Sequence, residues 1–328
     1  MGQFITAMQK YISIVLLVLV GFIPHNLLAA KYAGEAFSLG VGGRPLALGG
    51  ATIAGCFDGS AGYWNPAGMV SLTGRSITAM HAETFGSLLN HDYLAYIDSR
   101  PKENSLIQSF GFYLYYLGGG GIKITQLNQF NRPEVLREES HGDYLLAGSI
   151  AGSLHEKVDF GITAKIIYRD IGTETGKGLT MDAGLIYRYA EWLHLGLMVT
   201  DITTGFIRYS GDSFGTGSNS ESIYPTVKPG FMMTHEFKDF SGTFLMSGDI
   251  KFENIKYAAQ FWSGSLSLDT HYGFELGYKN VLFGRTGFDI GRFTAGAGFN
   301  ISHASIDFAY LQHDDLDETY RISGSYNF

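Results

Sequence analysis

The sequence is poor in cysteine and in positive charge. Its one cysteine, Cys56, excludes an internal disulfide framework. We expect Cys56 to be a buried, small apolar residue, as free cysteines usually are. Lys and Arg number 23 against 31 Asp and Glu, so the basic surface typical of nucleic-acid binding is missing. The composition therefore excludes a disulfide-stapled secreted domain and a nucleic-acid-binding protein.

No apolar run after Ala30 is long enough for a transmembrane helix. The run Ile12–Ile23 has 12 residues, whereas a helix needs about 20 to cross a bilayer. It follows Lys10 and is succeeded by small residues at Ala29 and Ala30, an order typical of a secretory signal peptide. We expect cleavage near Ala30. The mature chain then keeps 22 basic and 31 acidic residues, a net charge near −9.

Motifs for catalysis and cofactor binding are also missing. Gly172–Gly178 lacks the spacing of a phosphate-binding loop, so we expect a hairpin loop there, and a bend at a strand end at Gly118–Gly121. Asp314, Asp315 and Asp317 form a weak candidate for a divalent-cation site at the outer rim, and a solvated acidic turn is the favoured interpretation. We expect no enzymatic activity and no cofactor.

What the chain has in excess is aromatic residues and glycine: 20 Tyr, 24 Phe and 44 Gly. From Ser76 onward, apolar and polar residues alternate in segments of about 9–12 residues, the length of a tilted membrane-spanning strand. In Val158–Arg169 one face is Val, Phe, Ile, Ala, Ile and Tyr, and only Ile167 breaks the polar pattern of the other. Such alternation is typical of strands with rings toward lipid and small or polar residues inward.

The connections distinguish a membrane barrel from a soluble sandwich. We predict 14 strands: 75–83, 91–98, 105–116, 142–153, 157–169, 178–189, 192–200, 225–235, 242–252, 266–278, 281–288, 292–301, 304–312 and 318–328. Brief turns alternate with long connections at 117–141, 201–224 and 253–265, a sorting typical of outer-membrane barrels. The sequence therefore predicts an all-β transmembrane protein, a closed antiparallel β-barrel of about 14 strands.

The inward face predicted for these strands carries charge. A lumen filled by water or by a plug tolerates such residues, which lipid would not. They are Asp159, Lys165, Arg169, Asp182, Arg188, Asp249, Lys251, Glu275 and Asp307. Apolar lumen positions that could form a pocket are Ile167, Ile186, Met198, Leu245 and Leu311. We predict three parts: residues 1–30 as signal peptide, 31–73 as a plug, and 74–328 as the barrel.

The plug region carries a recognisable motif, Gly49-Gly50-Ala51-Thr52-Ile53-Ala54, then Asp58, then Asn65-Pro66-Ala67-Gly68 after Trp64. This series resembles the hatch of FadL-like outer-membrane proteins, and more closely that of the PorV/PorQ branch. His271-Tyr272-Gly273-Phe274-Glu275 and Arg285-Thr286-Gly287-Phe288 extend the resemblance along the barrel. The resemblance implies that the segment folds inside the barrel. Pro66 would hold Asn65 extended, and Gly68 would let the backbone turn closely against the barrel.

Two functions follow from this resemblance. The PorV-like interpretation, which we favour, is a docking or escort component for secreted cargo proteins, as in type IX secretion, with the long loops as contact surface. The alternative is a FadL-like transporter of hydrophobic compounds. A general porin is disfavoured because a hatch would block free diffusion. Tyr326 and Phe328 at the C-terminus resemble the signal read by the barrel-assembly machinery, so outer-membrane lipid and that machinery are expected partners.

Overall fold

A computed structural model describes residues 34–100, 105–172, 174–203, 205–211, 219–252, 259–313 and 316–328. All of them belong to one unit, Lys31–Phe328. The predicted signal peptide, residues 1–30, lies outside the described residues. In the described part of the chain, no helix combines the length and apolar character needed to cross a membrane.

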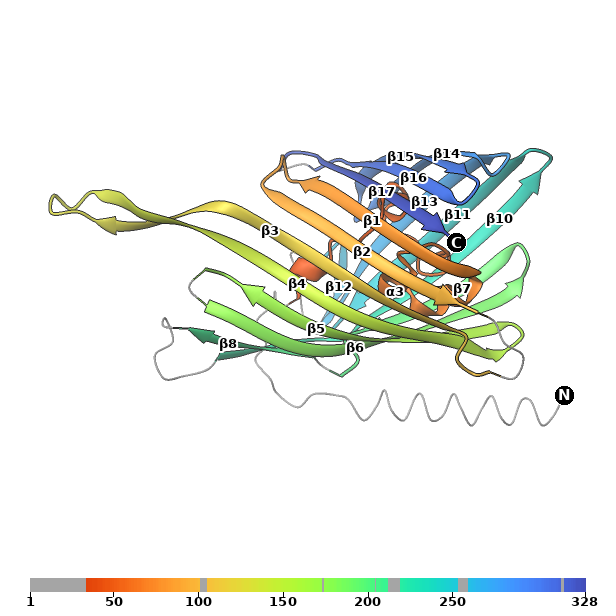
Figure 1. Ribbon diagram of the computed structural model, residues 1–328, viewed down its shortest axis with the longest axis horizontal. Coiled ribbons are helices and arrows are strands. Elements are labelled where there is room, and N and C mark those ends of the chain that lie inside the picture. The colour runs from red at the N-terminus through yellow and green to blue at the C-terminus, as the bar shows by residue number, and fades with distance from the viewer. Residues whose placement is uncertain are drawn as a thin grey trace. The chain divides into compact units, whose positions relative to one another are not determined.

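Fourteen of the seventeen strands in the described residues form a closed antiparallel ring (Figure 1). The last strand pairs with the first, with Ser76 opposite Asn327 and Glu83 opposite Tyr320. The ring therefore leaves no unpaired edge, as a sheet in lipid requires. Its strands are β1 (Gly74–Thr84), β2 (Leu89–Ser99), β3 (Ser109–Leu127), β4 (Pro133–His155), β5 (Val158–Asp170), β6 (Glu174–Ala190), β7 (Leu193–Thr200), β10 (Thr226–Phe237), β11 (Phe240–Lys251), β13 (Leu266–Tyr278), β14 (Leu282–Asp289), β15 (Arg292–Ile301), β16 (Ala304–Leu311) and β17 (Thr319–Asn327). The predicted barrel and its strand number are confirmed.

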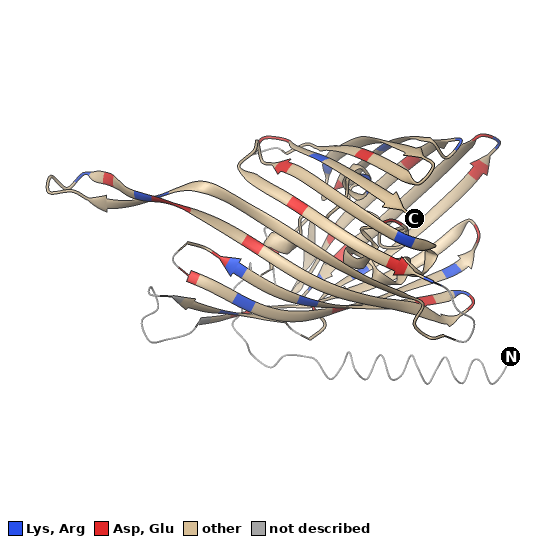
Figure 2. Ribbon diagram, viewed as in Figure 1, with Lys and Arg blue, Asp and Glu red and all other residues tan. Residues whose placement is uncertain are grey.

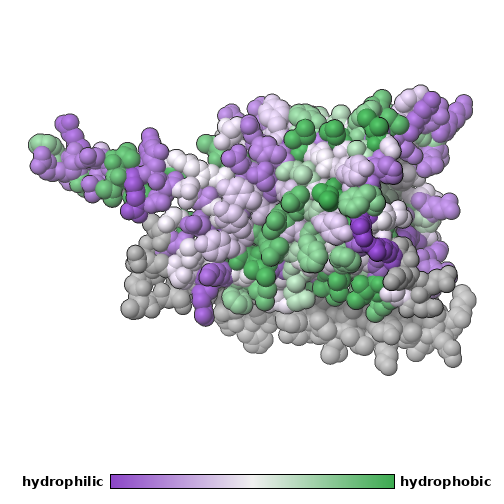
Figure 3. All heavy atoms as spheres, viewed as in Figure 1, coloured by the Kyte–Doolittle hydropathy of each residue, from purple (hydrophilic) through white to green (hydrophobic). Residues whose placement is uncertain are grey.

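Side chains along each strand alternate between the interior and the outside. In β5, Ile162, Ile166 and Tyr168 are exposed, while Thr163 and Lys165 between them are buried. Apolar side chains gather over the middle of the barrel face in Figure 3, and hydrophilic ones lie beyond it. The alternating pattern of the sequence thus gives an apolar outer band and a polar interior, as predicted.

Turn lengths differ between the two ends of the ring. At one end, the turns at 156–157, 191–192, 238–239, 279–281 and 302–303 are two or three residues long. We call this the short-turn end, and the opposite end the long-loop end. The backbone N–H of Arg75 donates to the Phe328 carbonyl at 2.9 Å, so the first and last strands of the ring both have their chain ends at the short-turn end.

The long connections contain more strand than the sequence predicts. Residues 117–141 were predicted as a loop, but β3 runs to Leu127 and β4 begins at Pro133, forming a two-stranded ribbon that extends beyond the ring (Figure 1). Figure 2 shows acidic and basic residues along this ribbon. Its polar composition concealed the strands, because neither face is buried and no apolar alternation is needed to form it.

The other two long connections also contain strands. β8 (Gly205–Gly211) and β9 (Asn219–Ile223) form a hairpin that pairs with β6, and β12 (Phe261–Ser263) pairs with β13. Two glycine-rich predictions were wrong as well. Most of Gly172–Gly178 belongs to β6, and Gly118–Gly121 lies within β3, where a register shift absorbs the glycines.

Residues 34–73 precede the ring and are called here the inner segment. They contain four short helices, η1 (Glu35–Phe37), α2 (Gly43–Ala47), α3 (Ala61–Trp64) and η2 (Pro66–Ser71). The α2 helix packs against β14–β17, and η2 packs against β2–β6, so the segment touches opposite sides of the ring. Val41, Ala47, Leu48, Ala61 and Met69 are fully buried in these contacts.

Candidate ligand-binding site

The glycine pair of the motif ends α2 at the inner face of β13 and β14. Gly49 and Gly50 have φ angles of 62° and 78°, which favour glycine. A side chain on Gly49 would press on the carbonyl oxygens of Phe288 and Tyr272. Ala51 is fully buried. These residues therefore turn the chain tightly against the ring.

Asn65 joins the inner segment to the ring by hydrogen bonds. Its side chain is fully buried; Nδ2 donates to the carbonyl of Ile53 at 2.9 Å and to that of Leu185 in β6 at 3.2 Å. Its Oδ1 accepts from the backbone N–H of Ala67 at 3.2 Å. Pro66 occupies the first turn of η2, where its missing N–H has no effect.

The close approach of this motif depends on glycines in the ring. Gly161 of β5 and Gly184 of β6 lie opposite each other, and a side chain on either would overlap Pro66 or Asn65. Gly68 was predicted to provide this approach, but it faces the carbonyl of Cys56 within the segment itself. The sequence could not reveal this, because Gly161 and Gly184 are far from the motif along the chain.

A buried charge network holds α2 in place. Arg44 Nε donates to Glu275 Oε2 at 3.0 Å, and Arg44 Nη1 lies 3.7 Å from Asp58 Oδ2. Glu275 and Asp307 both pair with Arg285, at 2.5 and 2.6 Å. Burial alone would lower the pKa of Arg44, but the carboxylates of Glu275 and Asp58 outweigh it and raise that pKa, so Arg44 stays charged. The motif residue Asp58 thus acts within a network that the sequence did not reveal.

Cys56 is fully buried and packs with Ala67 and Ile186. Its thiol donates to the Asn65 carbonyl at 3.3 Å. Burial, assisted by the nearby Asp58 carboxylate, raises the pKa of the Cys56 thiol, so the protonated, unreactive form dominates. The residue is a small apolar packing element, as predicted.

The two terminal predictions have different outcomes. Tyr326 and Phe328 point outward, are about half exposed, and stack with ring centroids 6.1 Å apart; their role as an assembly signal stays a prediction. In the acidic cluster, Asp314 and Asp315 lie outside the described residues, and Asp317 is exposed. Among described residues, no group of three His, Cys, Asp or Glu side chains could hold a metal ion.

The inner segment fills the ring toward the short-turn end. Met69 and Val70 of η2 pack with Ile97 and Ala151, and Ser109 Oγ donates to the Met69 carbonyl at 3.3 Å. Leu48 and Ala54 pack with Leu245, and Leu46 and Ala47 with Leu311. Leu245 and Leu311, which the sequence suggested as pocket residues, therefore pack against the inner segment.

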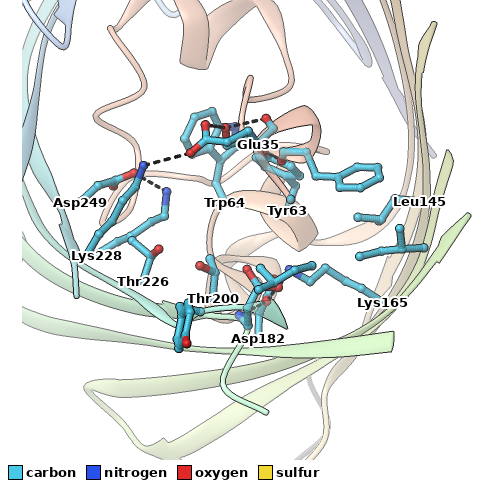
Figure 4. Close-up of a pocket in the computed structure, with 18 of the residues that line it drawn as sticks. Glu35, Tyr63, Trp64, Leu145, Lys165, Asp182, Thr200, Thr226, Lys228 and Asp249 are labelled. Carbon is cyan, nitrogen blue, oxygen red and sulfur yellow. Dashed lines mark hydrogen bonds and ion pairs between the residues drawn. The ribbon is translucent and has the colours of Figure 1, made fainter. Parts of the chain in front are cut away.

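A cavity that is open to solvent lies between the inner segment and the long-loop end of the ring. Its empty volume is about 960 Å³, including the part open to solvent. Figure 4 shows Lys228 and Asp249 on the opposite side of this cavity from Leu145 and Lys165, with Tyr63 and Trp64 of the inner segment between them. Of the predicted apolar lumen positions, Ile167 lines it.

Aromatic and aliphatic side chains form one part of the cavity surface. The rings of Tyr63 and Trp64 pack edge to face with their centroids 5.3 Å apart, and the centroid of the Tyr113 ring lies 6.3 Å from that of Tyr63. Hydrogen bonds fix both α3 rings: Tyr63 Oη donates to the Phe37 carbonyl at 2.7 Å, and Trp64 Nε1 to the Val41 carbonyl at 2.8 Å. Leu145, Ile167 and Ile223 complete an apolar surface held rigidly in place.

Ion pairs form another part of the cavity surface. Lys165 Nζ lies 2.6 Å from Asp182 Oδ1 and 2.8 Å from Asp201 Oδ1, and so joins β5, β6 and the start of the loop after β7. Lys228 of β10 pairs with Asp249 of β11 at 2.6 Å, and Lys251 lies 3.8 Å from Glu35. Alternation predicted that Lys165, Asp182, Asp249 and Lys251 face inward; it missed Lys228 and Asp201.

Comparison with known proteins supplies fold-level relatives. No family model and no curated protein matches the sequence. Among solved structures, the CymD monoaromatic hydrocarbon channel matches with a TM-score of 0.57 and 12% identity, over 88% of this chain and 98% of that one. The Pseudomonas putida toluene transporter TodX matches with a TM-score of 0.53 and 12% identity over the same shares, and a TodX deletion mutant with 0.53 and 11%.

At such low identity the likeness concerns the fold. These neighbours share the barrel fold with this chain, so the resemblance is confirmed at the level of the fold. The neighbours are described as a channel and a transporter. No comparison supports the finer assignment to the PorV/PorQ branch.

Proposed function

We propose that this protein is a channel that takes up small hydrophobic compounds across the outer membrane. The observation that carries the proposal is the cavity lined by Tyr63, Trp64, Leu145 and Ile167 inside a closed barrel. Small-molecule sites typically combine an apolar surface with a few polar groups that orient the ligand. Two structural neighbours are described as a monoaromatic hydrocarbon channel and a toluene transporter, which favours this function over secretion escort.

In this proposal the long-loop end faces the cell exterior and the inner segment acts as the hatch. A compound enters from the open cavity, leaves water for the aromatic surface, and gains about 25 cal/mol per Å² of apolar area buried. Passage to the periplasm then requires the inner segment to move, because Met69, Val70 and their neighbours close the short-turn end. Free diffusion of polar solutes is not expected through such a filled ring.

Filling the cavity tests the proposal. Thr200→Trp places an indole in the cavity, whereas Thr286→Trp makes the same change on the outer face of β14. Uptake of a labelled monoaromatic compound into liposomes that contain the full-length protein should fall for Thr200→Trp and stay unchanged for Thr286→Trp. If liposomes that contain the wild-type protein take up no more of the compound than liposomes without protein, the proposal is wrong.

The escort function remains the second candidate because of the β3–β4 ribbon. Its exposed residues include Ile122, Leu127, Phe130, Val135 and Leu136, an unusual set for a two-stranded projection in water. Replacing residues 121–138 by a short glycine-containing turn should leave uptake intact if the protein is a channel. The escort function would be favoured if a secreted protein co-purifies with the wild-type protein but not with the variant, and if neither protein takes up the compound.

A further inference from the structure

The charged residues of the cavity are already neutralised by one another. Its surface contains the lysines Lys165, Lys228 and Lys251 and the acids Glu35, Asp182, Asp201 and Asp249. Three cations and four anions leave one net negative charge. Each of the three ammonium groups lies within 4 Å of a carboxylate, at 2.6, 2.6 and 3.8 Å for the nearest oxygen of each.

This balance disfavours a carboxylate ligand. An anion would meet Asp249 beside Lys228, and Asp182 and Asp201 beside Lys165, and displacing any of these acids would leave it unpaired. Breaking a buried pair by removing one partner is strongly unfavourable, because the remaining charge loses its compensation. The net negative charge of the cavity adds repulsion.

The same ion pairs also disfavour a ligand that is only hydrocarbon. A lysine ammonium carries three donors, and the bond from Lys228 to Asp249 uses one of them. The hydroxyl groups of Thr200 and Thr226 lie on the same side of the cavity. A bare ring would strip water from these groups without replacing its hydrogen bonds, which sites built for hydrogen bonding penalise.

We propose, building on the channel function, that the cavity selects small aromatic compounds that carry one uncharged hydrogen-bonding group, such as phenols. The ring packs on Tyr63 and Trp64, and the hydroxyl faces Lys228 and Asp249. Phenols satisfy both parts of the surface: the ring buries apolar area, and the hydroxyl both donates and accepts. The Lys228–Asp249 ion pair would determine which ligand is preferred, and the rings of Tyr63 and Trp64 would provide most of the binding free energy.

Binding to the purified full-length protein in detergent tests the selectivity. The chain has three tryptophans, so Trp192→Phe and Trp262→Phe leave Trp64 as the only indole, and its emission reports the cavity. The ligands are p-cresol, toluene, p-toluate and benzylamine. We expect p-cresol to bind roughly tenfold more tightly than toluene, the effect of one satisfied hydrogen bond, and p-toluate to bind most weakly. Equal or tighter binding of toluene, p-toluate or benzylamine would overturn the proposal.

Paired substitutions locate the selectivity. Lys228→Met with Asp249→Leu removes a whole ion pair, and His271, which lies 3.7 Å from Asp249, keeps its closer partner Asp289 at 3.0 Å. The preference for p-cresol over toluene should therefore disappear. Lys228→Gln with Asp249→Asn keeps hydrogen-bonding groups and should retain it. The control pair Arg137→Met with Glu139→Leu removes an ion pair on the ribbon and should change nothing. Retained preference in the Met/Leu protein would refute the role of this pair.

Liposome uptake separates this proposal from the channel function. If p-cresol binds selectively but neither compound is taken up, the channel function fails and the selectivity stands. If both compounds are taken up and bind equally, the channel function stands and the selectivity fails.

Discussion

Replacing Asn65 by alanine should release the inner segment from the ring without disturbing the ring itself. Asn65 makes three hydrogen bonds, to Ile53, Ala67 and Leu185, and is fully buried. Alanine supplies none of them. The barrel strands keep their own ladder, so the loss falls on the attachment of the segment.

The size of the effect follows from those three bonds. A typical hydrogen bond contributes a net of about 1 kcal/mol, and a buried group left unsatisfied can exceed that. The attachment of the inner segment should therefore weaken by about 3 kcal/mol, a roughly hundredfold rise in the population of the released state. Most of the lost free energy should appear in the segment, because its contacts with β6 depend on this side chain.

Hydrogen exchange of amides in residues 34–73 measures the release directly. Those amides should exchange faster in Asn65→Ala, while amides of β1 and β17 keep their protection. Asn128→Ala is the control: its Oδ1 accepts from the N–H groups of Phe130 and Arg132 on the distant ribbon. If exchange in the segment is the same in both variants, Asn65 does not hold the segment and the reasoning is wrong.

Three further predictions concern single features of the chain. Cys56 should resist maleimide in the folded protein, because burial raises its pKa, and a cysteine placed at exposed Ser87 in a Cys56→Ala background should react at once. Deleting Phe328 should reduce heat-modifiable, membrane-inserted protein in cells, and normal insertion would contradict an assembly role. The Arg44→Met protein should conduct small ions in planar bilayers, because Glu275 loses the partner that fixes α2. A conductance equal to that of the wild-type protein would show that Arg44 does not anchor the segment.

The sequence was sufficient to predict the barrel because the same physical rule acts at every strand. Lipid outside and a filled lumen inside require alternation, and residues such as Ile162, Thr163 and Lys165 follow it. Strand ends were less predictable outside the apolar band, where alternation of apolar and polar residues is not required. The ribbon of β3 and β4 extends beyond the ring, where neither lipid nor a filled lumen requires sustained alternation, so the sequence did not mark its full length as strand.

The candidate site was predictable only in part, because alternation gives the direction of a side chain but not its partner. Lys165 and Asp249 could be assigned to the lumen from their strands. The pairing of Lys228 with Asp249 depends on β10 and β11 lying side by side, and that of Arg44 with Glu275 on the path of the inner segment. Resemblance to a known motif located Asn65, yet the glycines that receive it, Gly161 and Gly184, have no local signature.

The lumen is divided into a filled part and a part with a cavity, and under the proposed channel function the first would block passage and the second would bind the ligand. Toward the short-turn end, apolar residues of the segment pack against the ring, and Asn65 and Arg44 fix the segment by directional bonds. Toward the long-loop end, the same segment turns Tyr63 and Trp64 into the cavity. Any movement that opens the barrel must therefore also disturb these two rings. If the protein is the channel proposed above, ligand binding and opening are coupled through the inner segment, and a ligand that orders the rings should slow hydrogen exchange around Asn65.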